Sequence, residues 1–111
     1  ILISKVTENL IESIYKKPRT YGIYHLAPKG ETTWHEIAKI FLKFAKNYGL
    51  LLKTDPDKII AISSTEFPTK AARPKNSIFN TEKIEKEIKF DLPHWSDDFI
   101  NISKNILNNY I

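Results

Sequence analysis

The chain has 111 residues, a formal net charge of +4 and a pI near 9.2. This length suits one domain, spanning residues 1–111, that can bury about two-thirds of its unfolded surface. The absence of cysteine excludes disulfides and thiolate chemistry and fits a cytoplasmic protein. No apolar run approaches the ~20 residues of a membrane span, and the first residues lack the pattern of a signal peptide.

The basic charge is spread over the whole chain. Lysines occur in almost every segment and alternate with acidic residues, as they do between Glu82 and Glu87. Such a pattern is typical of a solvated surface and not of a stripe that follows a phosphate backbone. We therefore expect no nucleic-acid partner.

The first predicted elements are a helix and a short strand. Apolar residues recur at helical spacing, which predicts a helix over about 4–15. Its apolar face comprises Ile3, Val6, Leu10, Ile14 and Ile11. A strand is predicted over 22–26, closed by Pro28 and Gly30. Within it, we expect His25 to be half-buried and structural.

A second helix has clear signals at both ends. Thr33 and Glu36 have the spacing of a capping box, and Gly49 is a natural left-handed stop. The buried side of this helix should comprise Ile37, Phe41, Phe44, Ala45 and Tyr48, flanked by Trp34. A second short strand is predicted over 59–62.

The last third of the chain predicts two more helices. A brief extended segment at 78–79 precedes a short helix that Asn80 to Glu82 cap and that ends near Ile88. The last helix begins at 96–98, with apolar positions Phe99, Ile102, Ile106 and Tyr110. The predicted fold class is thus α/β, a small α+β-like domain of about four helices and two or three short strands. A complete nucleotide-binding α/β fold would need five or more strands.

The segment 65–77 is the strongest candidate for a binding site. Its two prolines fix their own φ and push the residue before each toward extended backbone. Arg73 precedes the second proline, and its planar guanidinium can grip a phosphate through two hydrogen bonds. Asn76 and Ser77 follow it. This pattern predicts a site for an anionic ligand, and a stiff surface connection with a solvated Arg remains the alternative.

Catalytic motifs are scarce. His25, His35 and His94 are not at metal-ligand spacing. The hydroxyl run 63–65 has no general base nearby in the sequence, and the chain lacks a Gly-rich phosphate loop and a Tyr-x-x-x-Lys pair. We expect no redox chemistry from this chain alone.

Five segments taken together resemble a known family. They contain Gly-x-Tyr-His-Leu, Thr-Thr-Trp, Arg-Pro-x-Asn-Ser, Asn-Thr-Glu-Lys and Leu-Pro-x-Trp, at 22–26, 30–38, 62–77, 80–84 and 92–95. In this order they closely resemble the carboxy-terminal, substrate-binding part of the dTDP-4-dehydrorhamnose reductases, which are extended short-chain dehydrogenases/reductases. The resemblance covers essentially the whole chain. Because the sequence contains no Met, we expect a piece of a longer protein that begins after the Rossmann half.

The resemblance implies an activity for the intact protein. Such an enzyme reduces the 4-keto group of dTDP-4-dehydro-β-L-rhamnose with NADPH or NADH, giving dTDP-L-rhamnose for bacterial surface polysaccharide. The cofactor site and the catalytic Tyr and Lys of the family belong to the amino-terminal Rossmann half, which is the implied partner of this chain. The fragment alone is expected to be inactive, and its face toward that half should expose apolar residues, with 67–72 among the candidates.

The resemblance also implies roles for four residues. Arg73 matches an Arg-Pro element whose Arg approaches the nucleotide pyrophosphate in related reductases, where a bidentate contact is favourable. Asn76 and Ser77 are implied hydrogen-bonding neighbours. Trp34 is expected either to line the cleft or to lie in the core beside its helix cap.

Two further points bear on partners. Some members of the family place a carboxylate in the last helix that helps to bind Mg²⁺ at a dimer interface, whereas residues 103–110 contain no acid. Because Asn is a poor Mg²⁺ ligand beside carboxylates, we expect no metal-linked dimer, and a homodimer of another kind stays open. The rival hypothesis is a non-catalytic regulatory subunit of the methionine adenosyltransferase type, which shares the fold and acts by protein interaction.

Overall fold

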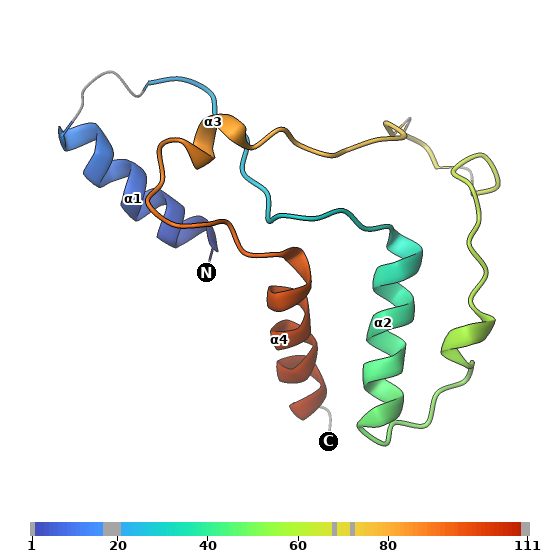
Figure 1. The fold of residues 1–111 in the computed structure, drawn as a ribbon. Helices are drawn as coiled ribbons and strands as arrows, with labels where there is room; N and C mark the ends of the chain where they lie inside the picture. The colour runs from blue at the N-terminus through green and yellow to red at the C-terminus, as the bar shows by residue number, and fades with distance from the viewer. Residues whose placement is uncertain (1, 17–20, 68, 72, 110–111) are drawn as a thin grey trace. The chain divides into compact units, whose positions relative to one another are not determined.

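The computed structural model describes residues 2–16, 21–67, 69–71 and 73–109. It contains four α-helices and one 3-10 turn, drawn in Figure 1: α1 (Leu2–Lys16), α2 (Trp34–Asn47), η1 (Pro56–Lys58), α3 (Glu82–Glu85) and α4 (Trp95–Asn108). The chain divides into two compact units, the first formed by residues up to 29 with 78–94, the second by 30–77 with those from 95 onward. The number of helices is as predicted, but no described residue belongs to a strand.

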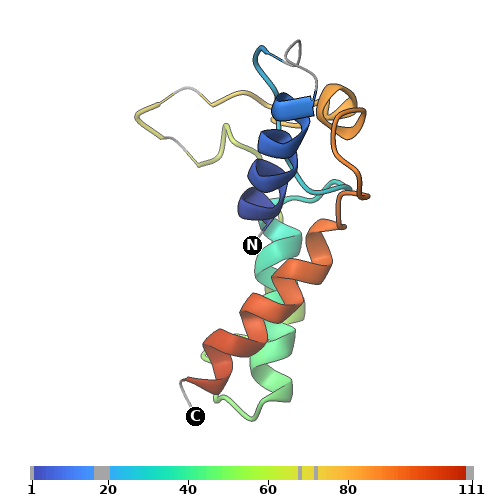
Figure 2. The same ribbon diagram turned by 90° about the vertical axis from the view of Figure 1, so that its left-hand side faces the viewer.

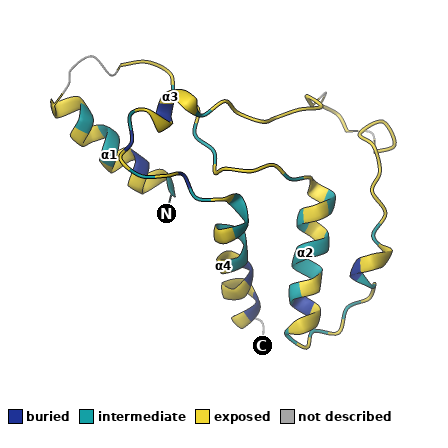
Figure 3. Cartoon of the chain, in the orientation of Figure 1, coloured by how far each residue is buried: buried dark blue, intermediate teal, exposed yellow. Residues whose placement is uncertain are grey.

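The first unit has a small core around α1. Val6 is buried with Ile84, Ile88 and Leu92, and the partly buried residues packed against them are Leu2, Leu10, Tyr24, Leu26 and Phe90. In Figure 3, α1 has a buried patch at Val6, with intermediate and exposed residues over the rest of the helix. Ile3, Ile11 and Ile14, which the spacing predicts on the apolar face, are exposed. The core is too narrow to cover the whole apolar stripe of α1.

Side chains hold the segment 22–26, and the predicted strand does not form. The Nζ of Lys83 donates a hydrogen bond to the carbonyl of Ile23 at 2.9 Å and lies 4.3 Å from the ring centroid of Tyr24. A strand needs a neighbour that bonds its backbone in a ladder, and here the neighbour contributes mainly side chains. The segment is therefore anchored without a sheet.

His25 is exposed and not half-buried as predicted. Its ring stacks on Phe79, with 5.2 Å between the centroids. The predicted extended segment at 78–79 therefore contributes an aromatic contact. One isolated parallel bridge, between Lys29 and His94, is the nearest approach to sheet in this unit, and the Lys29 N–H donates to the carbonyl of Pro93 at 2.8 Å.

The short helix α3 begins where the sequence predicts but ends earlier, and its N-cap Thr81 makes no side-chain capping bond. The Oδ1 of Asn80 accepts a hydrogen bond from the N–H of Glu82 at 2.9 Å. The helix ends at Glu85, not near Ile88, although the Ile88 N–H still donates to the carbonyl of Ile84 at 3.0 Å. Both isoleucines are buried in the core of the first unit.

The second unit is organised by α2, and both of its predicted ends are confirmed. The Thr33 hydroxyl accepts from the Glu36 N–H at 3.1 Å, and the Glu36 carboxylate accepts from the Thr33 N–H at 3.2 Å. At the other end Gly49 has a φ of +84°, where a residue with a Cβ is disfavoured. Ala45 is buried and the rest of the predicted face is half-buried.

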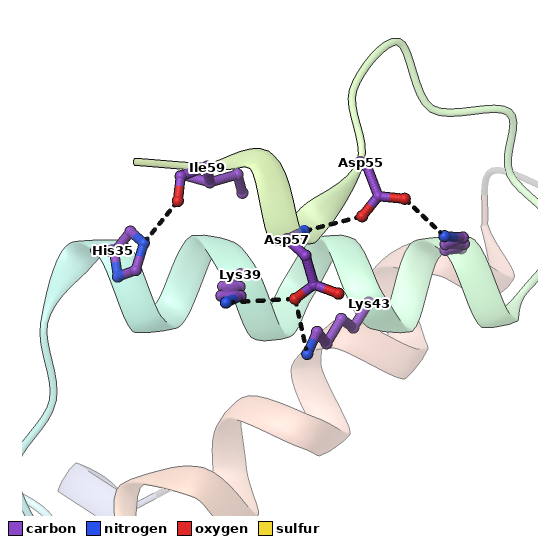
Figure 4. A network of polar contacts seen from close by, with 7 residues as sticks. His35, Lys39, Lys43, Asp55, Asp57 and Ile59 are labelled. Carbon is purple, nitrogen blue, oxygen red and sulfur yellow. Dashed lines mark hydrogen bonds and ion pairs between the residues drawn. The ribbon is translucent and has the colours of Figure 1, made fainter. Parts of the chain in front are cut away.

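The turn η1 is fastened to α2 by charged side chains, shown in Figure 4. Asp57 Oδ1 lies 3.3 Å from the Nζ of both Lys39 and Lys43. Asp55 caps η1 by accepting from the Asp57 N–H at 2.9 Å, and its other oxygen lies 3.0 Å from Lys46 Nζ. The bond from the Asp57 N–H, followed by Lys46, lowers the pKa of Asp55, and bonds from Lys43 and then Lys39 lower that of Asp57.

The predicted strand at 59–62 is likewise not formed. His35 Nε2 lies 3.0 Å from the carbonyl oxygen of Ile59, as Figure 4 shows, so it donates a hydrogen bond to that oxygen. The chain here runs along a helix and has no strand beside it. Its β-branched residues therefore lack a ladder partner, and Ile60 and Ile62 are exposed.

Helix α4 packs on α2, and the two helices lie side by side in Figures 1 and 2. It begins at Trp95, one residue before the predicted start. Ser103 and Leu107 are buried, whereas Ile102 and Ile106 are 55% and 40% exposed. The predicted apolar face is therefore wrong at these two positions, and Tyr110 lies outside the described residues. None of the helices in the described ranges is both long and apolar enough to cross a membrane.

Candidate functional site

The segment 65–77 follows η1 as an irregular trace in Figure 1. Each of its described residues is exposed, as the colouring of Figure 3 makes visible. Pro68 and Ala72 lie outside the described residues. The segment therefore offers its side chains to solvent and to a ligand, as the sequence predicts for a binding loop.

Arg73 is exposed and has no polar partner among the residues that the structure describes. Within the described part of the chain, no hydrogen bond or ion pair involves its guanidinium. A cation whose donors are not used inside the protein can use them all on an external anion. The geometry suits a phosphate contact, and it suits the solvated surface Arg equally, so the role of Arg73 stays a prediction.

The two polar neighbours of Arg73 differ. Ser77 is exposed, and no hydrogen bond joins it to another described residue. Asn76 is also exposed but already interacts within the protein. Their predicted roles as hydrogen-bonding neighbours of a ligand remain predictions.

Trp34 is not a core residue. It is the first residue of α2, directly after the cap Thr33, and its side chain is 81% exposed. This exposure removes the alternative of a buried Trp and leaves the cleft-lining interpretation as a prediction. No contact between described residues joins Trp34 to Arg73.

A turn at 63–66 is the best-defined local structure near Arg73 in the sequence. The Glu66 N–H donates to the Ser63 carbonyl at 3.0 Å, and Glu66 Oε2 accepts from both the N–H and the hydroxyl of Ser63 at 2.7 Å each. Ser63 Oγ also lies 2.7 Å from Thr65 Oγ1. The bond from the Ser63 N–H, followed by that from its hydroxyl, lowers the pKa of Glu66.

Sequence reasoning missed Glu66, although a signal was present. Ser63 and Glu66 have the Ser-x-x-Glu spacing of a capping box, in which the carboxylate bonds back to the first N–H. Here the same bond closes a turn that does not continue into a helix. The hydroxyl run at 63–65 is therefore structural, with the carboxylate as its centre.

Other features of the structure lie apart from this segment. The described residues contain no group of three or more His, Asp or Glu side chains that could hold a metal ion. A pocket of about 320 Å³ lies at the carboxy-terminal end of α2, lined by Lys46 and the segment 50–56. No predicted site residue lines this pocket. It lies where the chain passes from α2 to η1.

Comparison with known proteins gives a consistent family. The family model described as the RmlD substrate binding domain matches residues 2–108. The chain is 37% identical over 94 residues to a dTDP-4-dehydrorhamnose reductase of Shigella flexneri, covering 85% of this chain and 31% of that protein. It is 35% identical over 94 residues to the reductase of Salmonella typhimurium, with the same coverage. It is also 35% identical over 77 residues to that of Sinorhizobium fredii, covering 68% of this chain and 24% of the relative.

The chain thus spans about a third of the length of the first two relatives. The match nevertheless includes nearly every residue of this chain, both of its units, and the segment that carries Arg73. The chain belongs to the RmlD substrate binding domain family.

Proposed function

We propose that the chain is the substrate-binding domain of a dTDP-4-dehydrorhamnose reductase and that it binds the dTDP-sugar. The observation that carries this proposal is the family match over 2–108. The three relatives described above are all named dTDP-4-dehydrorhamnose reductase. These names favour the reductase over the regulatory subunit of the methionine adenosyltransferase type.

Arg73 is the proposed contact to the pyrophosphate of the nucleotide. Its support is the Arg-Pro-x-Asn-Ser pattern, its exposure, and the lack of any internal partner among the described residues. A bidentate, charge-assisted contact fixes both the position and the orientation of a phosphate group. Asn76 and Ser77 are proposed as neighbouring hydrogen-bonding groups, and Trp34 as an exposed aromatic wall of the cleft.

The role of this chain in the reaction is to hold the sugar nucleotide. The proposed cofactor, NADPH or NADH, supplies the hydride that reduces the 4-keto group. Its binding needs a Gly-rich turn at the end of a strand, and Gly22, Gly30 and Gly49 are too far apart to make one. We therefore assign cofactor binding and the catalytic residues to the Rossmann half of the intact protein, and we expect the isolated chain to be inactive.

A nucleotide that is held by its pyrophosphate has less freedom at its sugar end. Restricting the sugar relative to the hydride donor is how a binding domain contributes to rate. The chain is therefore proposed to raise the rate by orienting the substrate, with no proton or hydride passing through its own side chains. The proposed setting is the cytoplasm, with the Rossmann half as partner and a homodimer as a further possibility to measure.

An amide ¹⁵N titration with dTDP tests this proposal, with inorganic phosphate as the control ligand. We expect localised shifts at 73–77 with dTDP, and none there with phosphate at the same concentration. Arg73→Ala should abolish the shifts, whereas Lys75→Ala, which removes a neighbouring charge, should preserve them. Shifts that survive Arg73→Ala, or that phosphate reproduces, would contradict the assignment of Arg73.

The same titration of the intact protein, with its proposed Rossmann half, completes the test. If the 111-residue chain shows no shift but the longer polypeptide does, the Rossmann half completes the site. If neither binds dTDP, the proposed function is wrong.

A further inference from the structure

The carboxylate of Glu66 accepts hydrogen bonds within the turn at 63–66, to which Glu66 itself belongs. Oε2 accepts two hydrogen bonds from Ser63, one from the N–H and one from the hydroxyl, each at 2.7 Å. A serine hydroxyl has one proton, so once it donates to Glu66 the contact of 2.7 Å to Thr65 must have the Thr65 hydroxyl as donor. The donors run in one direction, from Thr65 to Ser63 to Glu66. The carboxylate is the acceptor at the end of this chain of bonds.

The location of this carboxylate needs an explanation. Glu66 lies seven positions before Arg73, in a segment that we propose binds a pyrophosphate, and like charges repel. A carboxylate is no ligand for a phosphate group, so its presence in the same segment of the sequence raises the question of what it does there. Hydrogen bonds to an ionised acceptor are shorter and stronger than those to a neutral one. The two bonds from Ser63 to Glu66 measure 2.7 Å each, and they lower the pKa of its carboxyl.

Among its described residues, the remainder of the segment is held by local polar contacts, and Asn76 is one of the residues that interact within the protein. The described residues of the segment are all exposed, so packing contributes little to its order. The Thr69 hydroxyl donates to the carbonyl of Ala71 at 2.8 Å, which fixes a second short stretch. A loop that is not ordered beforehand loses conformational freedom when it binds, and this weakens binding.

We propose that Glu66 is a positioning residue for the nucleotide site. It holds the turn at 63–66 and so fixes the direction in which the chain enters the segment that carries Arg73. The carboxylate contacts no ligand and acts through the order that it gives to the turn. This inference rests on the proposed function, because it assumes that the segment binds a dTDP-sugar.

Three variants of the intact protein test the inference. For each of them the affinity for dTDP is measured. Glu66→Ala should weaken dTDP binding about tenfold. Without the turn, the segment becomes ordered only when dTDP binds, and the free energy of that ordering opposes binding. Glu66→Gln should retain most of the affinity, since its amide oxygen can still accept from the Ser63 N–H. Glu8→Ala is the control, because it removes the same charge from an exposed position on α1 that forms no hydrogen bond among the described residues. It should leave the affinity for dTDP unchanged.

Simple electrostatics predicts the opposite result. If Glu66 only repels the pyrophosphate, Glu66→Ala binds dTDP more tightly than the unchanged protein, and Glu66→Gln does the same. Tighter or unchanged binding by Glu66→Ala would overturn the positioning role. The sign of the change in affinity therefore decides between the two accounts.

Kinetics and a double variant separate positioning from a general loss of structure. For reductase activity, Glu66→Ala should raise KM for the dTDP-sugar while KM for the nicotinamide cofactor stays unchanged. Ser63→Ala combined with Glu66→Ala should cost little more than Glu66→Ala alone, because the two residues act through one set of bonds. Additive losses, or a fall in kcat with no change in KM, would overturn the inference.

The inference and the proposed function fail differently. If Arg73→Ala weakens dTDP binding and Glu66→Ala does not, the proposed function stands and the positioning role is wrong. If the unchanged protein does not bind dTDP, both are wrong.

Discussion

Replacing Ser103 by Ala should stabilise the protein. Its side chain is 1% exposed, and its hydroxyl has no hydrogen-bond partner in the described part of the chain. A buried, unsatisfied polar group costs about 1–3 kcal/mol. Ala removes this cost and has a helix propensity about 0.5 kcal/mol better than Ser. The space left by one oxygen is smaller than a methyl-sized cavity, whose cost is about 1 kcal/mol. The expected net gain is about 1 kcal/mol in the free energy of unfolding.

Urea unfolding followed by circular dichroism measures this gain. For a domain of this size, 1 kcal/mol corresponds to roughly 4 °C or more in Tm. Asn105→Ala is the matched control, because it improves helix propensity at an exposed position of the same helix without touching the core. Ser103→Val tests the packing around this buried position and should destabilise by about 1–3 kcal/mol, because a full site resists added methyl groups. A loss of 1 kcal/mol or more in Ser103→Ala would refute the reasoning, since it would mean that the hydroxyl is paired.

Three further predictions concern the backbone at Gly22, the cap of α2, and the Asp57 carboxylate that pairs with lysines of α2. Gly22→Ala should destabilise by about 1–3 kcal/mol in urea unfolding, because φ is +139°, a conformation that residues with a Cβ rarely adopt. Thr33→Ala should cost about 1 kcal/mol through loss of the α2 cap, and Thr33→Ser should restore it. The Lys43 bond lowers the folded-state pKa of Asp57, so its stabilisation is present above the unfolded pKa and is lost as pH falls through the folded one. Asp57→Asn should therefore reduce the loss of stability on acidification, and an unchanged pH profile would contradict this.

Local signals predicted the helices well where the responsible groups are close in sequence. Thr33 and Glu36 are three residues apart, and their mutual hydrogen bonds depend only on the first turn of α2. Gly49 ends that helix because its own backbone needs a positive φ. Neither feature depends on what the helix packs against, so the sequence contains the necessary information.

The apolar face of α4 depends on its neighbour and was predicted less well. The spacing of Phe99, Ile102 and Ile106 indicates one face, whereas the buried positions are Ser103 and Leu107. A small serine lets two helices approach closely, and periodicity alone gives it no weight as a core residue. The face was mispredicted because periodicity ranks Ile102 and Ile106 above a small serine, whereas the serine is the residue that is buried.

The predicted strands failed for a related reason. The residues at 22–26 and 59–62 have the composition of strands, but a strand forms only beside another. The first segment is held by Lys83 and the second by His35, both through side chains that reach a backbone carbonyl. A sequence pattern cannot show whether a ladder partner is available.

The sequence singles out the segment around Arg73, and its role as a site stays a prediction. The exposure of the segment around Arg73 agrees with the prediction of a binding loop, whereas the core alternative for Trp34 is wrong. The role of Glu66 was missed, because a carboxylate in a polar loop has many possible partners. Only the hydrogen bonds to Ser63 distinguish it from a solvated acid.

The affinity of the protein for dTDP, compared with that for thymidine, tests the account most directly. Both ligands carry the base and the sugar, and only dTDP carries the pyrophosphate that Arg73 is proposed to hold. Arg73→Ala should lower the affinity for dTDP at least about tenfold, the effect of losing a charge-assisted hydrogen bond, and leave the affinity for thymidine unchanged. Equal affinity of the unchanged protein and Arg73→Ala for dTDP would contradict the assignment of this segment as the nucleotide site.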